Sequence, residues 1–157
     1  MSGWPSDWAD LVTGTTCSMC AAGRPDSDRY GIRVQAGVYT DAYLQRAAIQ
    51  RGYTVVIWRG RHVTEPTELS AEEASGYWLE ALRVAKALLR HYEPLKMNYE
   101  TLGNSLPHLH THLIPRYLAD PAPGRPFPLP VSDPASIPEE RLRREAAALR
   151  SLIVEGL

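Results

Sequence analysis

The chain has 157 residues, with 17 Lys and Arg against 18 Asp and Glu, for a formal net charge of −1. This length suits one compact domain over residues 1–157 that folds without disulfide bonds. Because charges of both signs are interspersed, the composition argues against a duplex nucleic-acid partner but allows a small anionic ligand. No apolar run reaches the ~18 residues of a membrane span, and the first residues lack signal-peptide features. We therefore expect a soluble, cytoplasmic protein without a membrane partner.

The first half of the chain predicts two strands and a long helix. Residues 1–30 are rich in turn formers and indicate mostly loop. Alternating apolar residues predict a strand over 31–39, and the β-branched and aromatic run 53–58 predicts a second strand after a turn region ending at Gly52. Ser70 and Glu73 have the spacing of a capping box and predict the start of a helix. Its expected apolar face consists of Trp78, Leu82, Ala85, Leu89 and Tyr92.

The second half predicts two further strands, a connector and a final helix. Residues 95–101 and 108–117 read as strands joined by a loop around Gly103. Seven of the 13 prolines fall within 121–138, so residues 119–138 are expected to form an extended connector. A helix from about 138 to 154 follows, with Ser136 as its cap and with Leu142, Leu149 and Ile153 as apolar contacts. The order of elements favours an α+β fold with an antiparallel sheet.

Three of the five histidines occupy alternate positions, His108, His110 and His112. On a strand, such residues share one face. A water-exposed polar face is one interpretation, but Leu109 and Leu113 alternate with the histidines as core residues would. A metal site is a second interpretation. Catalysis is a third, because a neutral imidazole is a competent nucleophile near neutral pH.

The run from Leu106 to Arg116 resembles the signature of the histidine triad (HIT) family, His-φ-His-φ-His-φ-φ with φ apolar. Thr111 departs from that pattern at one φ position. The segment 53–62, which ends in His62, and the helix from Ser70 also resemble parts of the family, so the likeness covers a core of about residues 17–117. It implies a HIT-like antiparallel sheet with a long helix and a C-terminal helix.

The resemblance implies a reaction at the α-phosphorus of a nucleoside phosphoramidate or dinucleoside polyphosphate. His110 would be the nucleophile that forms a nucleotidyl-histidine, with its second ring nitrogen bonded to the carbonyl of His108. His112 would assist as general acid. Phosphate contacts would come from Asn98, Asn104 and Ser105, of which Asn104 stands where relatives usually carry Gln.

The ribose contact is not assigned by the resemblance. Relatives commonly present an Asp at this point, and the nearest positions here are Gln45 and Arg46, with Asp41 slightly earlier. Among the arginines near the motifs, Arg59 and Arg61 are expected to be solvated charges at a strand end. Arg116 and Arg125 are nearer in sequence to the histidines and are better candidates for a phosphate contact.

The two cysteines, Cys17 and Cys20, form a Cys-x-x-Cys pair. Without an export signal, a metal or redox role is favoured over a structural disulfide. The resemblance to bacterial-type HIT proteins implies a structural zinc held by Cys17, Cys20, His62 and His108. Buried or redox-active thiols are the alternative.

We expect an enzyme, a HIT-type nucleotide hydrolase or nucleotidyl transferase with a small-molecule nucleotide substrate. The alternative is a nucleotide- or metal-binding module that has the fold but little turnover. A homodimer is also expected, because Leu79 and Leu88 extend the apolar face of the long helix beyond a single stripe.

Overall fold

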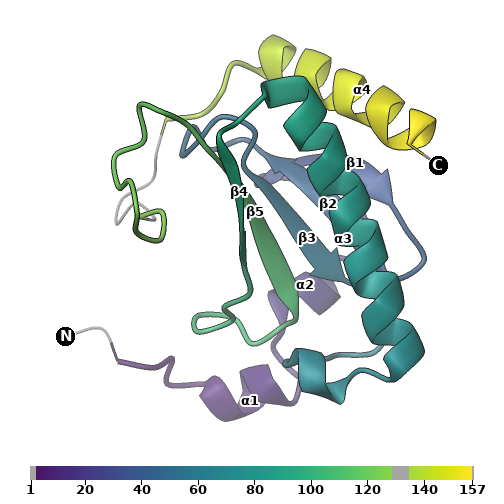
Figure 1. Cartoon of the computed structure of the whole chain (residues 1–157). Coiled ribbons are helices and arrows are strands. Elements are labelled where there is room, and N and C mark those ends of the chain that lie inside the picture. Colours follow the sequence, from purple (N-terminus) through teal and green to yellow (C-terminus); the bar gives the residue numbers. More distant parts are fainter. Residues whose placement is uncertain (1–2, 129–134, 157) are drawn as a thin grey trace.

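The structure, a computed structural model, describes residues 3–128 and 135–156, and its centre is one antiparallel sheet (Figure 1). The strand order is β1-β2-β3-β5-β4. The strands are β1 Gly31–Ala36, β2 Thr40–Gln45, β3 Thr54–Trp58, β4 Lys96–Glu100 and β5 His110–Arg116. The helices are α1 Trp8–Val12, α2 Ser18–Ala21, α3 Ala71–Tyr92 and α4 Glu139–Glu155, with a 3₁₀ turn η1 Pro66–Glu68. The predicted α+β class with an antiparallel sheet, a long helix and a C-terminal helix is confirmed.

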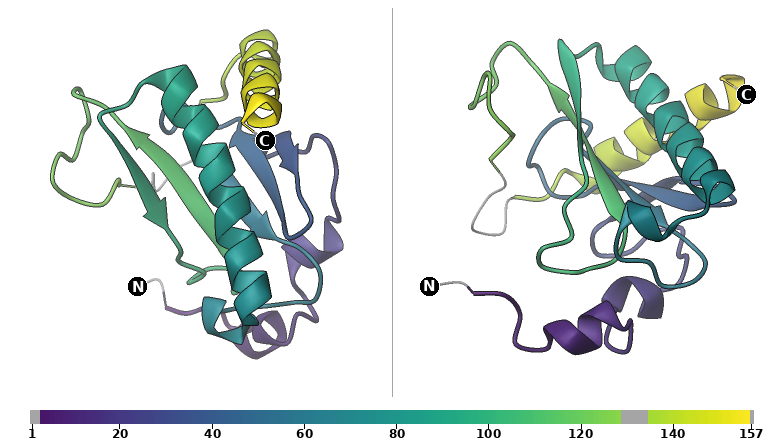
Figure 2. Two further views of the ribbon diagram at one scale, coloured as in Figure 1. Left: turned by 45° about the vertical axis from the view of Figure 1, so that its right-hand side comes forward. Right: turned by 60° about the horizontal axis from the view of Figure 1, so that its bottom comes forward.

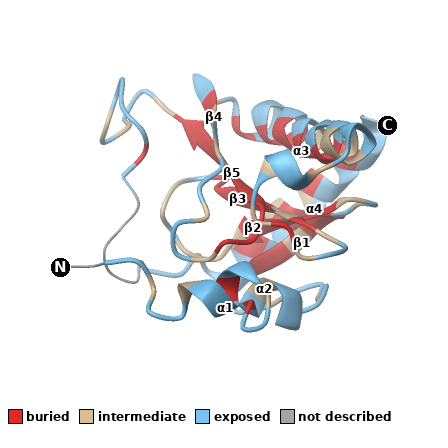
Figure 3. Cartoon of the chain, turned by 90° about the horizontal axis from the view of Figure 1, so that it is seen from below, coloured by how far each residue is buried: buried red, intermediate tan, exposed pale blue. Residues whose placement is uncertain are grey.

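Both long helices lie on the same face of the sheet (Figure 2). The predicted capping box starts α3, because Ser70 Oγ accepts from the Glu73 amide and the Glu73 carboxylate accepts from the Ser70 amide. Helix α4 packs on α3 and on β1. Its predicted contacts Leu142, Leu149 and Ile153 are all buried. The main core therefore lies between the sheet and the two helices, where Figure 3 shows buried residues concentrated.

The predicted apolar face of α3 was partly wrong. Ala85 and Tyr92 are buried, but Trp78, Leu82 and Leu89 are 37%, 41% and 39% exposed. The face of α3 that packs on the sheet consists of Tyr77, Ala81, Val84, Ala85, Leu88 and Tyr92. Because α3 carries apolar residues over a wide arc, periodicity alone did not identify the side that meets the sheet.

Two further local predictions were wrong. The supposed turn region before Gly52 contains β2. Residues 3–30 are mostly loop, as predicted, with the short helices α1 and α2 within them. Ser136 does not cap α4: Pro138 is the N-cap residue, and it supplies no side-chain hydrogen bond. Ser136 instead forms an isolated β-bridge with Ala47. None of the helices in the described part of the chain has the length and apolar character of a membrane span.

The other face of the sheet is partly covered by the Pro-rich segment. Phe127 is buried against Tyr53, Val55 and Ile114. Its ring also lies under the Arg116 guanidinium, at 5.5 Å from the centroid. The next apolar residue of the segment, Leu129, lies outside the described residues. The Pro-rich segment does not cover the part of this face near β2, β3 and the start of β5, and that part forms the candidate site.

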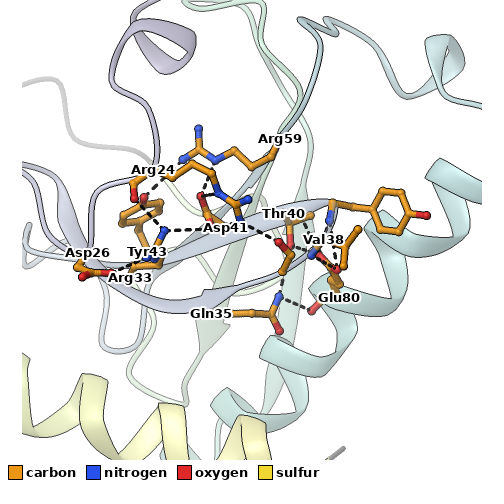
Figure 4. Close-up of polar contacts among 12 residues, drawn as sticks. Arg24, Asp26, Arg33, Gln35, Val38, Thr40, Asp41, Tyr43, Arg59 and Glu80 are labelled. Carbon is orange, nitrogen blue, oxygen red and sulfur yellow. Dashed lines mark hydrogen bonds and ion pairs between the residues drawn. The ribbon is translucent and has the colours of Figure 1, made fainter.

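A buried carboxylate on α3 fixes the turn between β1 and β2. Glu80 is 7% exposed and accepts hydrogen bonds from the amides of Val38, Tyr39 and Thr40 and from Thr40 Oγ1, at 2.7–3.2 Å. Figure 4 shows this carboxylate reaching from the helix into the turn. Bonds between a carboxylate and backbone amides are strong, and each donor left without a partner would be costly.

Replacing this carboxylate should destabilise the fold. We expect Glu80→Ala to lower the free energy of unfolding by about 3 kcal/mol, because it removes the acceptor for several buried donors. Lys86→Ala, at an exposed position of the same helix, is the matched control and should change stability little. Urea unfolding of both variants measures the difference, and equal stabilities would contradict this role for Glu80.

Candidate functional site

A cavity of about 490 Å³ lies between α2 and the open face of the sheet. Strand residues reach it at every second position, because alternate side chains of a strand share a face. The lining residues include Met19 from α2, Tyr43 and Gln45 from β2, Tyr53, Val55, Ile57 and Arg59 along β3, and His110 and His112 from β5. The intervening residues of β3, Thr54, Val56 and Trp58, are buried, Val56 and Trp58 in the core beneath the helices.

Two histidines stand next to each other at the edge of this cavity. His110 pairs with Ile57 and His112 with Val55 in the register of β5 against β3. The two imidazole centroids are 4.9 Å apart, with an interplanar angle of 74°. The residues between and beyond them, Thr111 and Leu113, are fully buried. The site therefore presents two imidazoles on a strand whose other face is fixed in the core.

The His110 ring is held in one tautomer. Its Nδ1 lies 2.6 Å from the carbonyl oxygen of His108. Because a carbonyl can only accept, Nδ1 carries the proton and Nε2 keeps its lone pair. The hydrogen bond expected from the sequence is thus present. Burial lowers the pKa of His110, although the bond to the His108 carbonyl acts in the opposite direction. A neutral imidazole with a free Nε2 is the form that can act as a nucleophile or bind a metal.

His112 has a partner that the sequence did not indicate. Its Nδ1 lies 2.6 Å from the hydroxyl of Tyr53, and the two rings stack with centroids 5.8 Å apart. Burial, with a smaller effect of His110, lowers the pKa of His112 to about 4. Burial also raises the pKa of Tyr53 to about 12, so the phenol stays protonated at neutral pH. Tyr53 can therefore donate to Nδ1 of His112, which leaves the proton of His112 on Nε2.

His108 does not join the other two imidazoles. Strand β5 begins at His110, and the His108 ring instead meets the cysteine pair: its Nδ1 is 3.4 Å from both Cys17 Sγ and Cys20 Sγ. His108 Nε2 donates to the carbonyl of Trp58 at 2.9 Å. His62 Nδ1 lies 3.3 Å from Cys20 Sγ. The four ligand atoms all lie within 4.8 Å of one another, so these residues could hold a metal ion.

A buried ion cluster forms the floor beside the cavity (Figure 4). Asp41 is fully buried, with Arg59 Nε at 2.7 Å and Arg24 bonded to both of its oxygens at 2.8 Å. Arg33 lies 3.6 Å from the same carboxylate. The expectation that Arg59 is solvated was therefore wrong, since its side chain is 9% exposed. Alternation along β3 points Arg59 to the same side as Ile57, where Asp41 neutralises part of its charge.

The remaining candidates are spread over the surface near the cavity. Asn104 and Ser105 are exposed in the loop before β5, and the next residue, Leu106, lines the cavity. Asn98 lies elsewhere on β4, where it accepts from Arg116. Together with Arg125 these two residues line a separate cavity of about 510 Å³. The phosphate contact expected from Arg116 or Arg125 is thus not supported by their position.

Of the three ribose candidates, only one lines the cavity. Gln45 does so, whereas Asp41 is enclosed by arginines. Arg46 is directed to Glu139 and to the carbonyl of Asp28.

Comparison with known proteins agrees with the geometry. The HIT domain profile matches residues 33–119, more than half of the chain. The chain belongs to the HIT family. The HIT protein of Bacillus subtilis (strain 168) is 33% identical over 91 residues, which are 52% of this chain and 62% of that relative. The match thus spans less than two thirds of the relative's length.

Solved HIT structures share the fold. A histidine triad protein from Bradyrhizobium japonicum superimposes with a TM-score of 0.71 at 25% identity, over 78% of this chain and 90% of that one. A HIT protein from Sinorhizobium meliloti 1021 gives 0.70 at 26% identity, over 82% and 91%. A zinc-bound HIT family protein from Mycobacterium smegmatis, at 20% identity, gives 0.64 over 90% and 95%, which supports the fold alone.

Several residues of this HIT site were missed from the sequence. Tyr53, Ile57 and Arg59 follow the two-residue period of β3, and that period could have placed them on one face. Their position opposite His112 and His110 depends on the register between β3 and β5, which are more than 50 residues apart in the chain. Met19 was missed because the predicted zinc site brings the cysteines to His62 and His108 but does not show which residue between them faces the sheet.

The pKa of His112 predicts a pH dependence of stability. In the folded protein His112 has a pKa of about 4, below its ordinary value of 6.5, so between these values the unfolded chain binds more protons. The contribution of neutral His112 is therefore complete above pH 6.5 and is lost as the pH falls toward 4. Between pH 7.5 and 4.5 we expect the wild type to lose about 2 kcal/mol more than His112→Asn.

Urea unfolding of both proteins at the two pH values measures this difference. Both carry the same Cys–His cluster, so effects of acid on that cluster cancel. Parallel losses of stability in the two proteins would contradict a buried, neutral His112.

Proposed function

We propose that the protein is a nucleotide hydrolase or nucleotidyl transferase that acts at the α-phosphorus of a nucleoside phosphoramidate or dinucleoside polyphosphate. The single observation that carries this proposal is the fixed tautomer of His110. His110 Nδ1 donates its proton in a hydrogen bond to the His108 carbonyl, which leaves the lone pair on Nε2, and His110 lines a cavity of nucleotide size. The lowered pKa of His110 keeps that lone pair available at neutral pH.

In the proposed reaction Nε2 of His110 attacks the phosphorus. A phosphorus–nitrogen bond forms, and the bond from phosphorus to the leaving amine or phosphate breaks with its electron pair. The bond to the His108 carbonyl stabilises the cationic ring as it becomes phosphorylated. Water then attacks the same phosphorus in a hydrolase, or another acceptor does so in a transferase, and its proton passes to His112, which has given its own to the leaving group. The phosphorus–nitrogen bond breaks with its electron pair returning to Nε2, which restores the neutral imidazole of His110.

His112 is the proposed general acid. In the protonated ring Nδ1 donates to the Tyr53 oxygen, and the proton on Nε2 is directed to the leaving group, so that its transfer leaves a neutral imidazole. In the free protein burial lowers the pKa of His112 to about 4, which would make the ring a poor store of an extra proton. An anionic phosphate entering the cavity adds a negative charge next to the ring and raises that pKa. Substrate binding thus supplies the counter-charge that the protonated ring needs.

Asn98, Asn104 and Ser105 are the proposed phosphate contacts. Asn104 and Ser105 are exposed directly before the cavity residue Leu106, so a phosphate at His110 is within reach of this loop. Asn98 would first have to leave Arg116. Gln45 is the proposed ribose contact.

Removing the nucleophile should abolish turnover. We expect His110→Ala to lower kcat by about a thousandfold or more while nucleotide binding changes little, because the lost group acts only in the chemical step. The measurement is nucleotide release from a panel of adenosine phosphoramidates and dinucleoside polyphosphates, with AMP binding by calorimetry. His91→Ala, at an exposed position at the end of α3, is the control. Near-normal rates in His110→Ala would exclude this mechanism, and a wild type that binds but never turns over would favour a binding module.

The Cys–His cluster is the proposed site of a structural zinc ion. Tetrahedral coordination with the usual Zn–S and Zn–N lengths separates sulfur and nitrogen ligands by about 3.5 Å, and the observed separations are 3.3–3.4 Å. The bond from His108 Nε2 to the Trp58 carbonyl leaves Nδ1 free as a ligand. When bound, such an ion would cross-link the N-terminal segment to the sheet.

Metal analysis tests the zinc site. Protein purified without added metal should contain about one zinc per chain, and Cys17→Ser/Cys20→Ser should contain none and unfold at a lower temperature. His91→Ala again serves as the control, since it removes a histidine outside the cluster. Zinc retained by the double variant would refute this ligand set.

A homodimer is proposed through the exposed apolar residues of α3. Trp78, Leu79, Leu82 and Leu89 are 37–62% exposed on one side of this helix. Such a surface is unusual for a monomer. Light scattering at micromolar concentration should give a dimer for the wild type and a monomer for Leu82→Asp. Leu118→Asp, at a loop residue that is 90% exposed, should stay dimeric. A monomeric wild type would contradict the proposal.

A further inference from the structure

A second recess, distinct from the histidine cavity, lies where α4 packs beside β1 and α3. Its volume is about 710 Å³, and it is lined by residues of all three elements and by Asp26 and Ser27. We call it the arginine groove, after its lining residues Arg33, Arg83, Arg143 and Arg150. Figure 4 shows Arg33 beside Asp26 and directed to Asp41, so its charge is already balanced by these two carboxylates.

The arginine groove has a surplus of positive charge. Arg33 is paired with Asp26 at 2.5 Å, and Arg143 with Glu139 at 2.7 Å. Arg83 and Arg150 have no acidic partner within 4.0 Å in residues 3–128 and 135–156. Within the same residues, the one acceptor of Arg150 is the backbone carbonyl of Arg33, at 2.6 and 3.0 Å. Two guanidinium groups in one groove, both without a carboxylate, favour an anionic ligand.

Arg83 has the fewest partners of these arginines within the described residues. It is half-buried on α3, and within the described residues it forms neither an ion pair nor a side-chain hydrogen bond. The groove therefore contains a guanidinium that has no partner in the described part of the chain and is available to an anion.

The edge of β1 does not offer a place for a peptide strand. The amide of Arg33 donates to the carbonyl of Asp26, and the carbonyl of Arg33 accepts from Arg150. The carbonyl of Gly31 accepts from the amide of Asp28. Addition of a strand needs free backbone groups at a sheet edge, and here they are occupied. The ligand must therefore be recognised by the side chains alone.

The spacing of the arginines favours an extended anion over a single charge. Arg143 and Arg150 are seven residues apart on α4, which separates them by about 10 Å along one side of the helix. Arg83 faces them from α3. Guanidinium groups bind phosphate oxygens in a bidentate manner, and a row of them matches a row of phosphates. We propose that the arginine groove binds an oligophosphate chain, free or attached to a nucleoside, at a site separate from the histidine cavity.

The test uses inorganic tripolyphosphate and calorimetry of the full-length protein at physiological ionic strength. We expect binding by the wild type and a loss of affinity of about tenfold or more in Arg83→Gln/Arg150→Gln, because charge-assisted hydrogen bonds are lost. Arg90→Gln/Arg144→Gln is the matched control. It also removes one arginine from α3 and one from α4, but neither lines the groove, and it should bind like the wild type. The single variant Arg83→Gln breaks no ion pair or hydrogen bond of the described residues. A loss of tripolyphosphate affinity in this variant therefore cannot be attributed to misfolding.

Three results would overturn the proposal. They are absence of tripolyphosphate binding, equal affinity in the groove and control variants, and binding of hexaglutamate as tight as that of tripolyphosphate. Titration with ATP distinguishes the two sources of the chain. The histidine cavity is unchanged in both double variants, so their difference in ATP affinity reports on the groove alone. If the two double variants differ more in affinity for ATP than for tripolyphosphate, the ligand is an oligophosphate attached to a nucleoside. If they differ equally for both, the ligand is a free oligophosphate.

Discussion

The alternation of side chains along β5 is the constraint on which the site depends. Thr111 and Leu113 are fully buried on the side of the helices, where Thr111 shares hydrogen bonds with Tyr77 and Thr101. A shift of one residue in the register would move these side chains to the open face and put His110 and His112 into the core. Because buried imidazoles without partners are costly, the hydrophobic core itself enforces the position of the two histidines. Packing on one face of the strand thus fixes the chemistry on the other.

The N-terminal segment needs a separate explanation, because it contributes little to that core. Its attachment relies on polar contacts: Arg24 binds the buried Asp41, and Tyr43 donates to the carbonyl of Pro25 at 2.8 Å. A fully buried carboxylate is stable only when cations and donors surround it, and here Arg59 from β3 joins Arg24. Asp41 therefore links the N-terminal segment, through Arg24, to Arg59 at the end of β3.

The sequence was informative where a pattern is local. The capping box at Ser70, the β-branched run of β3 and the alternation of β5 each involve residues close in the chain, and the structure contains the corresponding elements. It was uninformative where burial depends on distant partners. The arc of apolar residues on α3 could not show that Leu88 is buried and Leu89 is not. Likewise, Arg59 is an ordinary strand-end charge until Asp41, 18 residues earlier, is placed beside it.

The Cys–His cluster and the histidine cavity are joined through the backbone on two sides. Ser18 and Met19 lie between Cys17 and Cys20, and both line the cavity. On the other side, His108 contributes its ring to the cluster and its carbonyl to the Nδ1 proton of His110. A movement of the His108 backbone that takes its ring away from the cysteines would also displace the carbonyl that orients His110. The interaction that holds Cys17, Cys20, His62 and His108 together therefore also fixes the shape of the cavity and the tautomer of His110. It does so although none of the four side chains needs to touch a substrate.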